Sequence, residues 1–274
     1  MPRRLSSKVG HLSSSSSQRQ CERTSFSFYR AVREQLPVWL LEELRSMEVF
    51  SWEDGRARAF LPSEALMYAL VHDHQAYARF LLHEFSVRAL QPPRCGLCRL
   101  RGGAPHLAVA VRYDRVAILG MVLEALKDQE AREDRPVQDF LDNRGGCAHV
   151  ADGGKTLVQL AVELSRPDCL LLLLACGVPP SGLDAALQRL ASCDAADRRH
   201  AQCCVDFLLL FLPEPPVLCR LQAEAQSLLG NKVSSWLCGL APPPLLLQAL
   251  RCLARSGPNQ IPALPDFLQL HSCQ

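Results

Sequence analysis

The chain contains 274 residues, of which 48% are hydrophobic and 21% are charged, and its net charge is +2. This composition suits a packed protein core, and the near-neutral charge argues against a nucleic-acid partner. No apolar run approaches the roughly twenty residues that a membrane-spanning helix requires. Residues 1–10 also lack the apolar centre of a secretory signal. We therefore expect a cytoplasmic protein that does not insert into membranes.

The sequence contains thirteen cysteines, an odd number in a chain without a recognisable secretory signal. This usage favours reduced thiols over a disulfide framework. Cys169, Cys203 and Cys204 fall at core positions of expected helices, where a free thiol packs as a small apolar group. No nucleophile elbow, zinc-protease helix or kinase loop occurs, so we expect no catalytic residues and no cofactor.

The amino-terminal part divides into a tail and a helical segment. Residues 1–23 are polar and include a run of serines, which predicts a disordered tail. Residues 24–60 carry apolar side chains at helical spacing on both sides of Pro37, which predicts two helices broken at that proline. The apolar positions are Phe28, Val32, Leu36, Trp39, Leu40 and Leu44. We expect a helical cap over the end of a repeat array; the alternative is a partner-binding helix.

Residues 61–212 contain a recurring pattern. In three segments, an aliphatic residue and an alanine are followed, at identical offsets, by two further aliphatic residues. The three sets are Leu66, Ala69, Leu81 and Leu82; Leu107, Ala110, Val122 and Leu123; and Val158, Ala161, Leu173 and Leu174. A fourth set, Leu183, Ala186, Leu209 and Leu210, fits only if about eleven residues around 192–201 form a loop. The pattern predicts stacked pairs of short helices.

The repeat is most regular between residues 154 and 178. Ala161 allows two helices to approach closely, Pro167 can open the second helix, and Gly177 can end it with a left-handed backbone. The segment resembles an ankyrin repeat, with matching residues at Gly154, Thr156, Ala161, Leu173, Leu174 and Gly177. The resemblance implies an all-α, degenerate ankyrin-repeat solenoid with about four repeats and uneven connecting loops.

Two groups of potential metal ligands occur early in the chain. His72, Asp73 and His74 are consecutive, but in the repeat register Asp73 and His74 occupy the turn where ankyrin repeats have Gly-His, so we expect turn structure there. Cys95 and Cys98 form a C-x-x-C pair without a second pair at zinc-site spacing. We expect no bound metal, with a metal- or redox-responsive regulator as the alternative.

Residues 213–274 differ in character, because the prolines after Leu212 end the repeat pattern. Pro244 can open a helix on which Leu245, Ala249 and Leu253 form one stripe. This stripe resembles the elongin-binding box of SOCS-box proteins, which implies that the helix docks into a groove. In so leucine-rich a chain the pattern also arises by chance. A second match occurs at Ala186, Leu187, Ala191 and Ala195, inside the fourth repeat.

A SOCS box continues into a segment that contacts a cullin through a proline-containing motif. Here Leu264 and Pro265 match that motif imperfectly. The alternative is a proline-rich tail that packs on the preceding helix. The expected organisation is therefore a SOCS-box-like module over residues 213–274 that follows the repeats of residues 61–212.

Four long stretches of the chain are distinctive, namely SFSFYRAVREQLPVWLLEELR, PSEALMYALVHDHQAYARFLL, LAVAVRYDRVAIL and WLCGLAPP. They resemble the ankyrin repeat domain-containing protein 9 family. The resemblance implies a substrate receptor that joins elongin B/C and a cullin 5–RING module, with IMP dehydrogenase as a target. The first alternative is a non-catalytic ankyrin scaffold without a ligase role.

Overall fold

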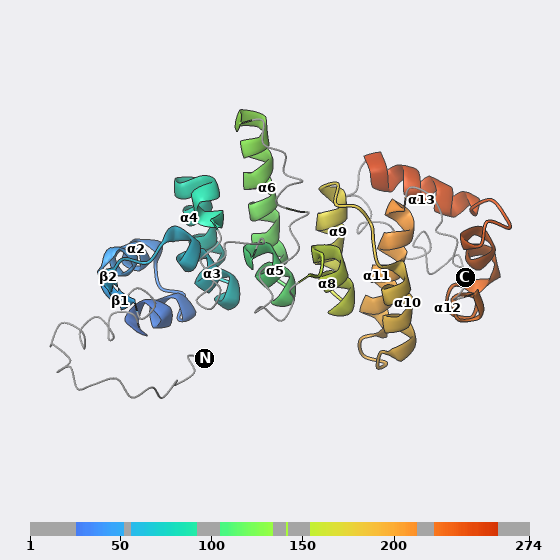
Figure 1. Cartoon of the computed structure of the whole chain (residues 1–274), viewed down its shortest axis with the longest axis horizontal. Helices are drawn as coiled ribbons and strands as arrows, with labels where there is room; N and C mark the ends of the chain where they lie inside the picture. Colours follow the sequence, from blue (N-terminus) through green and yellow to red (C-terminus); the bar gives the residue numbers. More distant parts are fainter. Residues whose placement is uncertain are drawn as a thin grey trace.

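The computed structural model describes residues 26–51, 56–91, 105–133, 141, 154–212 and 222–256. Within these ranges the elements are helices, apart from one short two-stranded ribbon. Figure 1 shows the helices standing in pairs, side by side along the long axis of the molecule. The all-α solenoid predicted from the sequence is confirmed.

Four helix pairs follow one another in the region where the sequence predicted repeats. They are α3 (Pro62–His72) with α4 (Gln75–Phe85), α5 (Pro105–Arg112) with α6 (Val116–Glu133), α8 (Leu157–Glu163) with α9 (Pro167–Ala175), and α10 (Leu183–Ser192) with α11 (Arg198–Phe211). The aliphatic residues and alanines of the recurring pattern are buried in all four pairs. A short 3-10 helix, η1 (Ser86–Leu90), packs against α3 and α4.

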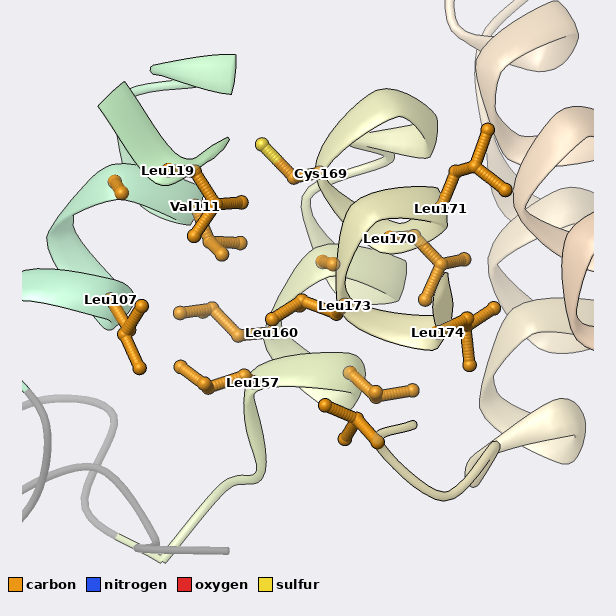
Figure 2. Close-up of a cluster of buried hydrophobic side chains, with 14 of the residues drawn as sticks. Leu107, Val111, Leu119, Leu157, Leu160, Cys169, Leu170, Leu171, Leu173 and Leu174 are labelled. Atoms are coloured by element: carbon orange, nitrogen blue, oxygen red, sulfur yellow. The ribbon is translucent and has the colours of Figure 1, made fainter. Parts of the chain in front are cut away.

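Neighbouring pairs bury one another. In Figure 2, Leu107 of α5 faces Leu157 and Leu160 of α8, whereas Leu171 and Leu174 of α9 point to the opposite side, toward the next pair. These residues belong to one continuous buried cluster. A single pair would leave one of these faces in water, so the stability of each repeat depends on its neighbours.

The same turn joins the helices of the first three pairs. Between the two helices of each pair, one residue has a left-handed backbone; these residues are Asp73, Asp114 and Ser165, with φ of 55°, 57° and 52°. The next amide donates to the carbonyl of the pattern alanine; for example, the His74 amide donates to Ala69 at 2.9 Å. This hydrogen-bond arrangement ends a helix and reverses the chain. His74 then opens α4, and its Nδ1 accepts from the Tyr77 amide at 3.3 Å.

The amino-terminal segment has the same construction. A helix over residues 26–33 and α2 (Val38–Ser46) meet at Gln35, whose φ is 54°, and the Leu36 amide donates to Ala31 at 3.0 Å. The predicted break at Pro37 is therefore confirmed, and the cap is a fifth, divergent helix pair. It leads into the antiparallel ribbon of β1 (Val49–Ser51) and β2 (Arg56–Arg58), which the sequence analysis did not predict.

One of the apolar residues at helical spacing in this segment does not pack inward. Trp39 is 68% exposed, and Leu41 is the buried residue of α2. The buried face of α2 is set by what it packs against, namely α4, and a leucine fits that contact. Phe28 fills the remaining space beside Phe60, at 4.7 Å between ring centroids.

The connection inside the fourth pair is also shorter than predicted. About eleven residues around 192–201 were predicted to form a loop, but α10 extends to Ser192 and α11 already begins at Arg198. The larger offset between Ala186 and Leu209 arises mainly because α10 continues well beyond Ala186, whereas α8 ends soon after Ala161, and because α11 has an additional amino-terminal segment. Longer helices, more than a longer loop, therefore accommodate the extra residues.

Two further helices complete the described chain. Helix α12 (Gln222–Leu237) is interrupted at Gly230, whose φ of 75° breaks the helical backbone. Helix α13 (Leu245–Ser256) follows a turn at Gly239 and packs on α11; with α12 it lies at the opposite end of the molecule from α2 and the ribbon (Figure 1). Within the described ranges, no helix combines the length and apolar character needed to cross a bilayer.

Candidate functional site

Helix α13 begins where the sequence forces the chain to change direction. Three prolines, Pro242–Pro244, cannot donate main-chain hydrogen bonds and so cannot continue α12. Pro244 immediately precedes the helix, and its carbonyl accepts from the Gln248 amide at 2.9 Å. The Gln248 side chain donates to the Pro243 carbonyl at 2.9 Å. The start of the helix is thereby fixed by local bonds.

The inner face of α13 is firmly attached to the repeats. Leu247, Leu250 and Ala254 are buried. Arg251 donates to the carbonyl of Leu212 at the end of α11, and its guanidinium lies 5.0 Å from the centroid of the Trp236 ring. Partial burial and the neighbouring Arg255 lower the pKa of Arg251, although the group stays charged near neutrality. The helix is thus held by both apolar packing and a charged hydrogen bond.

The outer face displays the predicted box. Leu245 is 84% exposed, Ala249 is exposed, and Leu253 and Pro244 are partly exposed. These positions lie on one side of the helix because they recur every four residues. The structure therefore brings the four predicted box residues together on an accessible stripe. Cys252 is exposed beside them. The predicted cullin-contacting residues, Leu264 and Pro265, lie outside the described residues.

In the second match to the same pattern, the leucine is buried instead of exposed. Leu187 is 1% exposed, and Ala186 is buried with it on the inner face of α10. A partner could reach Leu187 only if the fourth helix pair opened. The sequence pattern is the same in both matches, so it cannot tell which leucine is accessible. The burial of Leu187 and the exposure of Leu245 distinguish them.

An exposed leucine that was not predicted from the sequence precedes the stripe along the chain. Leu240 is 73% exposed and stands between the turn at Gly239 and the prolines. A leucine that lies between the turn after a helix and a run of three prolines has few ways to become buried, and this local signal could have identified it. An open depression of about 520 Å³ lies at the same corner; it is lined by Asn231, Lys232, Ser235, Ala241, Pro242, Pro244 and Leu245.

The other candidate ligands behave differently. His74 is a buried turn residue whose Nε2 donates to the Leu36 carbonyl at 3.0 Å, so it ties the cap to the first pair, as expected of turn structure. Cys95 and Cys98 lie outside the described residues. Of the three cysteines predicted at core positions, Cys169 and Cys204 are buried, and burial raises the pKa of each thiol, whereas Cys203 is only partly buried. No three His, Cys, Asp or Glu side chains gather as metal ligands in the described part of the chain.

Stacked pairs of short helices, joined by a recurring left-handed turn, define this chain as an ankyrin-repeat protein. No protein-family model and no solved structure matches it. Ankyrin repeat domain-containing protein 9 of Mus musculus is 40% identical over 298 aligned positions, covering 92% of this chain and 90% of the mouse protein. The chain belongs to the ankyrin repeat domain-containing protein 9 family.

Proposed function

We propose that this protein is a cytoplasmic, non-catalytic substrate receptor of an elongin B/C–cullin 5–RING ubiquitin ligase. One observation supports the proposal most strongly: the stripe of Leu245, Ala249 and Leu253 faces outward on a helix whose opposite face is packed on the repeats. An apolar stripe in water is stabilised when a partner covers it.

The recognition would follow the helix-in-groove mode. Leu245 has the most exposed side chain of the stripe and would enter an apolar pocket of elongin C, where burying a leucine contributes about 1.5–3 kcal/mol. Ala249, one turn later, has a side chain small enough for the partner backbone to approach. Leu253 would extend the contact by another turn. No charged residue occurs from Leu245 to Leu250, so the first half of the stripe can be desolvated at little cost.

The repeats would hold the target protein. Ankyrin arrays bind other proteins through adaptable surface residues on a rigid stack. The docking of α13 on α11 would keep the ligase side at a constant position relative to the target. Family resemblance proposes IMP dehydrogenase as the target.

A binding experiment with purified elongin B/C and the full chain tests the proposal. Leu245→Asp places a carboxylate in the proposed pocket and should abolish binding without changing the melting temperature. Leu61→Asp is a matched control, because Leu61 is an exposed leucine at the other end of the repeats. Wild-type affinity for Leu245→Asp would contradict the box. Failure of the wild-type chain to bind elongin B/C would favour an ankyrin scaffold without a ligase role.

A further inference from the structure

We propose that the corner between α12 and α13 is a second contact for the same elongin subunit, and that it accepts an apolar side chain next to a carboxylate. This inference rests on the proposed function. It adds Leu240 and Lys232 to the residues that determine affinity, and neither belongs to the box pattern.

Leu240 is held on the surface by the turn that precedes it. The turn that ends α12 is closed by hydrogen bonds from the Gly239 amide to Trp236 at 2.9 Å and from the Leu240 amide to Ser235 at 2.9 Å. With its backbone held in this way and prolines following, Leu240 keeps its side chain in water, where it is 73% exposed. Trp236 and Leu237, in the preceding turn, are buried. The turn therefore leaves the Leu240 side chain on the surface instead of packing it into the core.

The corner is continuous with the predicted elongin-binding box. Leu245, the proposed anchor, also lines the depression of about 520 Å³ together with Pro242 and Pro244. A partner that covers Leu245 therefore borders the depression, whose walls combine apolar proline and alanine surfaces with the polar ends of Asn231 and Ser235. The volume is large enough for a side chain of the partner.

The charged residues near the corner are all basic. From residue 227 to residue 256, the charged residues are Lys232, Arg251 and Arg255, and no Asp or Glu occurs. Arg251 is engaged with Leu212 and Trp236, whereas Lys232 is exposed on the wall of the depression. A partner surface with carboxylates is complementary to this region, and complementarity of this kind accelerates association.

The test uses the full chain and elongin B/C in a kinetic binding assay at low and high salt. Leu240→Ala should weaken binding roughly ten-fold, as expected when a leucine contact is lost. Lys232→Glu should slow association several-fold at low salt, and the difference from wild type should shrink at high salt. Leu245→Asp is the reference for loss of the box, and Leu61→Asp is the control for an exposed leucine elsewhere.

A second measurement does not depend on any variant. Amide hydrogen exchange of the wild-type chain should slow at residues 231–245 as well as along α13 when elongin B/C is added. If Leu245→Asp abolishes binding while Leu240→Ala and Lys232→Glu bind as wild type and residues 231–240 gain no protection, the second contact is wrong and the proposed function stands. If wild type does not bind elongin B/C, both proposals fail.

Discussion

The guanidinium of Arg251 lies over the indole ring of Trp236, with its Cζ 5.0 Å from the ring centroid. The same guanidinium donates to the carbonyl of Leu212, the residue that follows α11. One side chain of α13 therefore joins α12, the last repeat and the candidate binding helix. This arrangement makes Arg251 the main polar link between the repeats and the exposed stripe.

Replacing Arg251 by alanine should detach α13. Loss of a charged hydrogen bond and of the contact with Trp236 should lower the free energy of unfolding by about 2–3 kcal/mol. Urea denaturation measures this change, and hydrogen exchange should show faster opening of α13 than of α8 and α9. Arg255→Ala is the control, because Arg255 is exposed and its bond to Leu212 is longer, at 3.4 Å. If Arg251→Ala and Arg255→Ala lowered the free energy of unfolding equally, Arg251 would not be the main polar link.

The two matches to the box pattern should respond differently to truncation. Leu187→Ala should reduce the free energy of unfolding by about 2–5 kcal/mol, because it leaves a cavity in the fourth helix pair. Leu245→Ala should change it by less than about 0.5 kcal/mol, because the side chain is already in water. Chemical denaturation of the two variants measures the contrast. A strongly destabilised Leu245→Ala would mean that this leucine packs inside the protein.

Acid should destabilise the protein through His106. This histidine is buried at the start of α5, its Nε2 donates to the Ser63 carbonyl at 2.9 Å, and burial lowers its pKa to about 4. An unfolded histidine titrates near 6.5, so below that pH the unfolded chain binds a proton that the folded chain does not. The stabilising contribution of neutral His106 is therefore present above pH 6.5 and is lost as the pH falls toward 4.

Through His106, the free energy of unfolding should fall by about 2 kcal/mol between pH 7 and pH 5. His106→Gln can keep a donor to Ser63 but does not titrate, so the pH dependence of its unfolding free energy should be smaller by that amount. His83→Gln is the control, because His83 is exposed. If the unfolding free energies of wild type and His106→Gln changed with pH in the same way, His106 would not be buried in the neutral form.

The left-handed turn of the cap offers a stabilising substitution. Gln35 has φ of 54°, which glycine adopts freely and other residues adopt at a cost of roughly 1 kcal/mol. Gln35→Gly should therefore raise the melting temperature relative to Gln35→Ala. The alanine variant keeps the strained backbone and, like the glycine variant, removes the Gln35 side-chain bond to His72. Calorimetry of the two variants measures the cost of the left-handed backbone at residue 35. A glycine variant no more stable than the alanine variant would contradict this cost.

Much of the repeat architecture was predictable because its signals are local. The alanines at Ala69, Ala110 and Ala161 mark where two helices touch, and each aliphatic partner is buried as expected. Pro167 opens α9 and Gly177 follows it with φ of 86°, both as predicted. The repeat-like turn at Gln35 was not recognised, because the cap lacks the offsets that the other pairs share. The ribbon of β1 and β2 was missed because three-residue strands have too few positions to show a period.

The amino-acid order by itself determined the stacked helix pairs, since helical periodicity, small residues at close approaches and turn residues act over a few positions. It also determined that two segments could form the same leucine stripe. Only the tertiary structure decided between them, because exposure depends on which surfaces pack together. Leu187 meets the neighbouring helices and is covered, whereas α13 is the last described helix and no described element covers Leu245.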